Sequence, residues 1–332
     1  MKNKIILLLS LLLAVLPCWG ENPQVGVVTF CKGSASLIRG EEVRDLKVDE
    51  LLLTNDVLKT GKNGKIRVIL NLPGGSKSQT VGPDSEVAVS SMVSVNVQGK
   101  AKLGTVAREM IGMLVSTKVQ TGQGIAAVRG PKLVDPGWLV DDACLLLTKG
   151  SHLAFPHRLM ATPNEECDEY RFSVYKIDGE LLFSGVSTSP AIILPDSIKE
   201  PGLRFSVKVG FRKGGETLQE VAREISLLGA TASVQLRAEL GDIEKSMDDD
   251  EDPTVFLLSG QEFLRQKCYS EAVLSFSQYC RTVPESKLGT AFLKKALNEL
   301  DWLNPTDPEI ESFLNVKPVL LAEQSDLLLL DE

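Results

Sequence analysis

The sequence is poor in the side chains that most often carry catalysis or bind metals. It has two histidines and six cysteines in 332 residues, and no C-x-x-C pair. The sequence contains no Gly-x-Ser-x-Gly, no His-Glu-x-x-His and no phosphate-binding glycine loop. These absences argue against a zinc ribbon and against the common hydrolase and nucleotide-binding classes, and they favour a protein that is not an enzyme.

One cluster of metal-binding residue types is nevertheless present. His152 and His157 flank Pro156, and Cys144 and Cys167 lie nearby in the sequence. Their spacing matches no common zinc pattern, so an interdomain turn is the favoured place for the two histidines. We therefore expect no metal and no cofactor, while an enzyme or metal carrier built on this cluster stays open as an alternative.

Positive charge is also in deficit. The chain has 36 lysines and arginines against 44 aspartates and glutamates, with a net charge of −8 and a pI of about 5.1. A nucleic-acid partner would require a basic face for the phosphates, so nucleic-acid binding is not expected.

The chain has few long apolar runs, and the one at its start is typical of a secretory signal. A basic beginning is followed by an apolar run over residues 5–16 and by small residues near Gly20, which predicts cleavage after Gly20. The run is too short to span a bilayer. Cys18 could carry a lipid, but Pro17 disfavours this. We expect a signal peptide over 1–20 and a periplasmic or secreted protein without a transmembrane segment.

Removal of the signal peptide leaves an odd number of cysteines, which is not typical of a disulfide-dense scaffold. Cys268 and Cys280 fall at opposite ends of one predicted helix, roughly 18 Å apart at a rise of about 1.5 Å per residue. Both should therefore be free thiols.

Residues 24–150 have the pattern of a β domain. Short β-branched or apolar runs are separated by turns that contain glycine or proline, and the segment 92–120 is less regular. Asp56 and Asp84 stand in turns and could be ligands or acids, but aspartate in such turns more often holds its own backbone. The expected strand-containing stretches are 25–30, 33–37, 51–61, 65–72 and 81–89.

The order of these strands and turns, with Val128-Arg129-Gly130 in the later segment 124–134, resembles the FecR domain. This family is an extracytoplasmic β module named for a ferric-citrate signalling protein. The resemblance covers 24–150 and implies association with envelope signalling. Arg129 could clamp a carboxylate of a partner through its planar guanidinium, or it could pair within the domain.

Residues 151–228 have the pattern of a small β-sandwich. Tyr170, Phe172 and Val174 alternate with polar residues, and Asp178-Gly179 is a hairpin signal. Several short strands at this spacing are typical of an immunoglobulin-like or fibronectin-type fold.

The remaining chain has helical periodicity. We expect a helix over 230–247, an acidic linker over 248–253, helices similar to tetratricopeptide repeats over 254–304, and a tail over 305–332. The acidic run lacks the spacing of a calcium loop, so a solvated linker is favoured. Because about three repeats are needed to bury a core, the helices should lean on the sandwich or on a partner.

The sequence thus predicts a multidomain, mainly β protein with a C-terminal α-helical hairpin region. The predicted function is that of a cell-envelope scaffold or a ligand-sensing or signal-sensing module that acts through protein–protein interaction. The alternative is a structural or glycan-binding envelope protein, and self-association is compatible with both. Candidate partner-binding residues are Arg129, and Phe276 and Phe292 with their neighbours Leu274 and Leu293, if these form an exposed apolar face.

Overall fold

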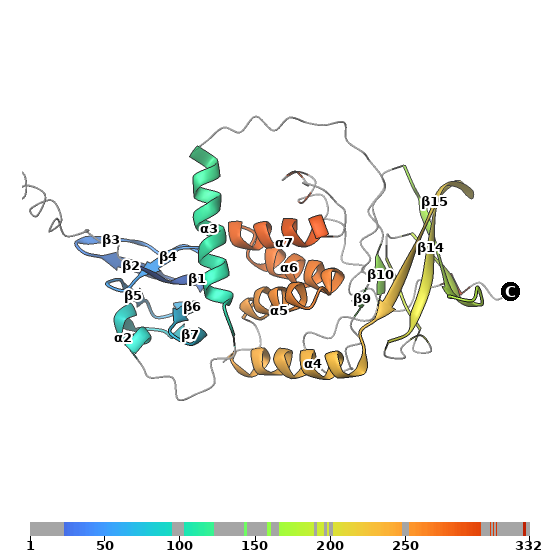
Figure 1. The fold of residues 1–332 in the computed structure, drawn as a ribbon. Coiled ribbons are helices and arrows are strands. Elements are labelled where there is room, and N and C mark those ends of the chain that lie inside the picture. The colour runs from blue at the N-terminus through green and yellow to red at the C-terminus, as the bar shows by residue number, and fades with distance from the viewer. Residues whose placement is uncertain are drawn as a thin grey trace, which may run out of the picture.

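The computed structural model describes residues 23–94, 103–122, 143–144, 158–160, 166–188, 191–195, 198, 202–247, 252–299, 306, 308, 310 and 328–329. Within this part of the chain, a β module formed by the N-terminal residues and a larger β-sheet flank a group of helices (Figure 1). The chain is rich in β-sheet and has several C-terminal helices, as the sequence predicts.

The N-terminal β module, residues 24–88, consists of two four-stranded sheets. Their strand orders are β4-β1-β6-β7 and β3-β2-β5-β8, and all of the pairs within them are antiparallel. Apolar side chains from both sheets meet in a common core that includes Leu37, Leu58 and Val68. The strands are β1 (Gln24–Lys32), β2 (Ala35–Arg39), β3 (Glu42–Asp45), β4 (Leu51–Leu53), β5 (Val57–Thr60), β6 (Lys65–Leu72), β7 (Gly75–Val81) and β8 (Glu86–Ala88).

Strand β6 is buried on both of its faces. Ile66, Val68 and Leu70 face the core between the two sheets, whereas Arg67 and Ile69 alternate with them and are also buried. Because successive side chains of a strand point to opposite faces, Arg67 and Ile69 must be covered by something outside the β module. The C-terminal helices provide that cover.

The larger sheet is six-stranded, with the order β16-β12-β11-β14-β15-β9, and β10 and β13 pair separately. In β11 the buried residues Tyr170, Phe172 and Val174 alternate with more exposed neighbours. One face of this sheet is therefore packed against a core. The hairpin predicted at Asp178-Gly179 is present, with Gly179 at φ 95°. The strands are β9 (Ala143–Cys144), β10 (Arg158–Met160), β11 (Glu169–Lys176), β12 (Leu181–Ser187), β13 (Ala191–Ile193), β14 (Arg204–Lys213), β15 (Glu216–Leu227) and β16 (Leu328–Leu329).

Six helices are described. Helix α3 lies largely within residues 92–120, which the sequence predicts to be less regular. Its buried residues Val106, Met110 and Leu114 recur every four positions, which is a helical spacing that we missed. None of the described helices is long and apolar enough to cross a membrane. The helices are α2 (Val89–Ser94), α3 (Val106–Gly122), α4 (Ala230–Lys245), α5 (Thr254–Arg265), α6 (Tyr269–Thr282) and α7 (Lys287–Glu299).

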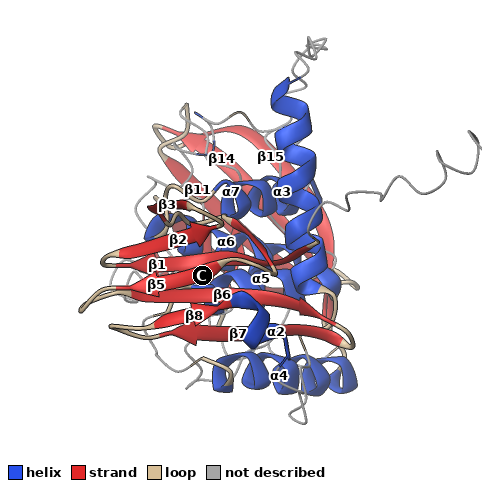
Figure 2. Cartoon of the chain, turned by 90° about the vertical axis from the view of Figure 1, so that its left-hand side faces the viewer, coloured by secondary structure: helices blue, strands red, loops and turns tan. Residues whose placement is uncertain are grey.

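The C-terminal helices pack against the N-terminal β module. Val27 and Ile69 of the module share one hydrophobic cluster with α3 and with buried residues of α5, α6 and α7, such as Phe263, Phe276 and Leu293. In Figure 2 the labelled strands of the N-terminal module, such as β1, β5 and β6, lie in front of α5, α6 and α7, and α3 runs along one side. The larger sheet has a separate core. The prediction that the helices lean on the sandwich or on a partner was therefore wrong, because their apolar faces are covered by the N-terminal module.

Candidate functional site

The candidate site is a pocket of about 310 Å³ at the junction of α3 with α5, α6 and α7. Helix α5 contributes Gln261, Leu264 and Arg265, which lie on one helical face because they are spaced by three and four residues. Tyr269, the first residue of α6, closes one side. Helix α3 contributes Glu109, which brings a segment far away in the sequence to the rim.

Helix α7 supplies the remaining wall. Phe292, Lys295 and Glu299 follow the i, i+3, i+7 spacing of one helical face. Phe292 is only 2% exposed, and its ring stacks on Phe276 with ring centroids 5.4 Å apart and planes 13° apart. The apolar part of the pocket is thus fixed by packing beneath it.

The structure places the predicted partner-binding phenylalanines in the interior. Phe276 and Leu293 are fully buried, and Leu274 and Phe292 are at most 3% exposed, so these four do not form an exposed apolar face. Phe276 lies against Gly260 of α5, where an added Cβ would come within 2.5 Å of the Phe276 ring. The glycine allows α5 and α6 to approach closely, and the two phenylalanines serve the core. Of these four, Phe292 also lines the pocket described above.

Gln261 is the most unusual residue of the pocket. It is 2% exposed, and neither its side-chain nitrogen nor its side-chain oxygen has a hydrogen-bond partner among the described residues. A buried amide without partners costs about 1–3 kcal/mol, so such groups are rare in folded proteins. The sequence signal for this residue is weak, because Gln261 is one of three polar residues, with Ser259 and Glu262, in the middle of α5.

Charged groups of both signs surround the pocket. Arg265 and Lys295 are cationic, and Glu109 and Glu299 are carboxylates. Glu109 accepts a hydrogen bond of 2.8 Å from the Thr105 hydroxyl. The rim therefore combines both signs of charge around an apolar and amide-bearing interior.

A coupled carboxyl pair lies next to this rim. Burial, together with a hydrogen bond to Glu239 of α4, raises the pKa of Glu262 to about 7. The same hydrogen bond lowers the pKa of Glu239. Arg265 lies 3.2 Å from Glu262 and 4.0 Å from Glu239. The pair holds a proton near neutral pH, so the charge around Arg265 depends on pH.

The seam between the N-terminal module and the helices contains a buried ion pair. Arg67 of β6 donates a hydrogen bond of 2.5 Å to Asp252, and both side chains are at most 1% exposed. Asp252 also accepts a hydrogen bond of 3.0 Å from the Thr254 backbone at the start of α5. We predicted that Asp252 belongs to a solvated acidic linker. That prediction was wrong for this residue, because Asp252 neutralises Arg67; residues 248–251 lie outside the described part.

Further buried hydrogen bonds cross the same seam. The Tyr279 hydroxyl donates to the Thr29 carbonyl at 2.6 Å, and the Thr29 and Thr254 hydroxyls lie 3.0 Å apart. Asp49 accepts hydrogen bonds of 3.0 Å from the Ser286 hydroxyl and from the Leu288 backbone. Burial raises the pKa of Asp49 although these bonds oppose the shift. The seam is thus specified by directional bonds as well as by apolar contact.

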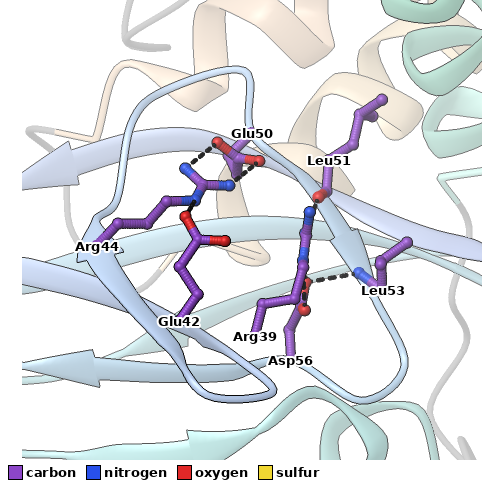
Figure 3. A network of polar contacts seen from close by, with 7 residues as sticks. All are labelled: Arg39, Glu42, Arg44, Glu50, Leu51, Leu53 and Asp56. Atoms are coloured by element: carbon purple, nitrogen blue, oxygen red, sulfur yellow. Dashed lines mark hydrogen bonds and ion pairs between the residues drawn. The ribbon is translucent and has the colours of Figure 1, made fainter.

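A second polar network lies within the N-terminal module (Figure 3). Arg39 donates to both carboxylate oxygens of Asp56, at 2.8 and 2.7 Å, and these bonds raise the pKa of Arg39. Asp56 also accepts a hydrogen bond of 2.8 Å from the Leu53 backbone, which confirms the predicted turn. Arg44 pairs with Glu50 in the same two-bond manner, at 2.9 and 2.7 Å. The network stabilises turns. The Asp56 and Glu50 carboxylates are already paired with arginines, so we do not consider them candidate catalytic or ligand-binding groups.

Several predicted site residues lie outside the described part of the chain: Arg129, His152 and His157. Of the cysteines in the predicted zinc cluster, only Cys167 has a described side chain, and its thiol donates to the Glu169 carbonyl. The described residues contain no group of three or more potential metal ligands. Neither Cys268 nor Cys280 forms a disulfide, as predicted, and burial raises the pKa of Cys280 to about 12.

Comparison with known proteins adds no assignment: no family model matches the chain, and no curated protein matches it significantly.

Proposed function

We propose that this protein is a non-catalytic, exported component of the cell envelope that acts as a scaffold or as a ligand-sensing or signal-sensing module through protein–protein interaction. The secretory signal that the sequence predicts over residues 1–20 and the resemblance of 24–150 to the FecR domain support this proposal. An immunoglobulin-like architecture for the second β part belongs to the same proposal, because such folds commonly present surfaces to partners.

The observation that supports the proposal most directly is that the C-terminal helices pack against the N-terminal module. The apolar faces of α5, α6 and α7 are buried against the N-terminal module, and the Arg67–Asp252 pair is buried in the seam. A rigid unit of this kind suits the support of a binding surface. Partner binding should therefore use a surface outside this core.

The face of the larger sheet opposite its core, which is exposed among the described residues, is the favoured surface. Its inward residues form a core of their own, while Arg171, Arg204 and Glu224 on the described strands are exposed and polar. Arg204 and Glu224 form an exposed ion pair of 3.1 Å, and Lys208 lies 5.4 Å from the centroid of the Tyr175 ring. Such pairs contribute little to stability, so they can exchange partners at an interface at low cost.

Photo-crosslinking in cells tests this proposal. A photoreactive amino acid is placed at Arg171 or Glu224 in the full-length protein, with Glu42 on β3 as the matched exposed position of the other β part. We expect the same envelope protein to be captured from both sheet positions and not from Glu42. If neither sheet position yields a protein adduct, the protein–protein interaction proposal fails and the glycan-binding alternative replaces it.

A further inference from the structure

We propose that the pocket between α3 and helices α5 to α7 binds a short peptide, with the peptide amide paired to Gln261 and the charged ends of the peptide held at the rim. This inference rests on the sensing role proposed above and names the chemical class of its ligand. The Gln261 amide, the charges at the rim, the size of the pocket and its position in the fold support it.

Gln261 is the group that selects an amide. Its side chain has one carbonyl acceptor and one NH2 donor in a single plane, and both are buried without partners among the described residues. A peptide group offers the complementary pair, because its N–H can donate to Oε1 and its carbonyl can accept from Nε2. A ligand with such a group would compensate for the buried amide, whereas a purely apolar ligand would leave it unpaired.

The rim favours a ligand that carries one charge of each sign. Lys295 can bind a carboxylate together with Arg265, which it shares with Glu262 at 3.2 Å, and Glu109 and Glu299 can bind an ammonium group. A polyanion such as a nucleotide would meet the two carboxylates, and a bare cation would meet the arginine and the lysine. A zwitterion with an amide between its charges is a peptide in its simplest form.

The dimensions limit the length of that peptide. A volume of about 310 Å³ is at the lower end of the range of small-molecule sites, about 300–1,000 Å³. Leu264, Tyr269 and Phe292 supply the apolar contact for side chains of the ligand. The pocket therefore suits two or three residues rather than an extended chain.

The pocket also joins two parts of the fold. Glu109 comes from α3, which packs on β1 and β7 of the N-terminal module as well as on α7. The other lining residues come from helices near the C-terminus. A ligand that contacts both sides is expected to stabilise their association, because anything that binds only the assembled state favours that state. Peptide binding would thus report on, and strengthen, the seam.

Native mass spectrometry of the full-length mature protein with an equimolar library of di- and tripeptides provides the first test. We expect one or more peptides to be retained at one per chain. The retained peptide is then titrated by calorimetry against the wild type, Gln261→Leu and the surface variant Gln24→Leu, whose residue is exposed at the start of β1 and does not line the pocket.

Gln261→Leu should weaken binding at least tenfold, while Gln24→Leu should leave the affinity unchanged. Gln261→Leu should also keep or raise the thermal stability, because it removes an unpaired buried amide, so loss of binding cannot be attributed to unfolding. The inference is overturned if the library yields no retained peptide or if Gln261→Leu binds as well as the wild type. Partner capture at Arg171 and Glu224 is a separate readout, so a failure of the peptide inference alone would leave the protein–protein interaction role intact.

Discussion

The two β parts of this protein obtain their cores in different ways. The larger sheet packs residues of its own segment, such as Phe172, Val207 and Phe211, into a separate cluster. The N-terminal module has one such core but shares a second one with helices that follow about 200 residues later in the chain, as Ile69 and Phe276 show. A boundary that looks like a domain boundary in the sequence is therefore not always the boundary of a cooperative unit.

The strand sequences explain this difference. In β11 buried and more exposed positions alternate, as expected for a sheet that is covered on one face. In β6 the five consecutive residues from Ile66 to Leu70 are all buried, as in a strand that is covered on both faces. Arg67 interrupts this run with a charge, and the charge is satisfied by Asp252 of the other segment.

The largest expected effect follows from breaking this ion pair. Asp252→Ala should lower the free energy of unfolding by about 3–5 kcal/mol, because it leaves the buried Arg67 guanidinium without its carboxylate. Chemical denaturation measures the change. The matched control is Glu224→Ala in the exposed Arg204–Glu224 pair, which should cost at most about 1 kcal/mol. Equal effects of the two substitutions would contradict the buried role of Asp252.

The next effect concerns the close approach of two helices. Gly260→Ala should destabilise the protein by about 3 kcal/mol, because the new methyl group would overlap the Phe276 ring. A Cβ added at Gly241 on α4 has no neighbouring atom within 4 Å, so Gly241→Ala should be neutral or should stabilise the protein by up to about 1 kcal/mol. Thermal unfolding measures the stability of both variants. If Gly260→Ala does not lower the stability, α5 and α6 are not in close contact at Gly260 and Phe276.

A pH effect should be confined to the unit that contains the helices. The pKa of Glu262 is about 7 in the folded protein and 4.5 for the free group, so the folded state binds this proton more tightly. Its contribution to stability is complete below pH 4.5 and is lost as the pH rises through 7. Between pH 5 and 8 the loss should be about 2 kcal/mol.

Glu262→Gln should remove most of this loss, since glutamine is neutral at both pH values. Hydrogen exchange during denaturation measures the free energy of unfolding at pH 5 and at pH 8, separately for the helices and for the larger sheet. If the larger sheet loses stability in the same way, or if the loss persists in Glu262→Gln, groups other than Glu262 cause the pH dependence.

The smallest effect tests one hydrogen bond across the seam. Tyr279→Phe should cost about 1 kcal/mol, because the Thr29 carbonyl loses a buried donor at 2.6 Å. The matched substitution Tyr175→Phe in the larger sheet should change stability by less than about 0.5 kcal/mol. Urea denaturation resolves the two values, and indistinguishable results would remove Tyr279 from the set of residues that specify the seam.

Local features of the fold were predictable from the sequence, whereas contacts distant in the chain were not. The alternating strands, the hairpin at Gly179 and the helices near the C-terminus follow from periodicity and turn residues. The role of Asp252 was not predictable in this way, because an acidic run has the same composition whether it is solvated or paired with Arg67. The pocket was missed for the same reason, since Glu109 and Gln261 are brought together only by tertiary packing.

The most direct test of the shared core is native-state hydrogen exchange as a function of denaturant on the full-length protein. Amides of β1 and β6 and of α6 and α7 should converge on one unfolding free energy, which Asp252→Ala lowers equally in all four elements. Amides of β11 and β14 should show a different value that Asp252→Ala leaves unchanged. Opening of β1 and β6 independently of α6 and α7 would contradict the shared core.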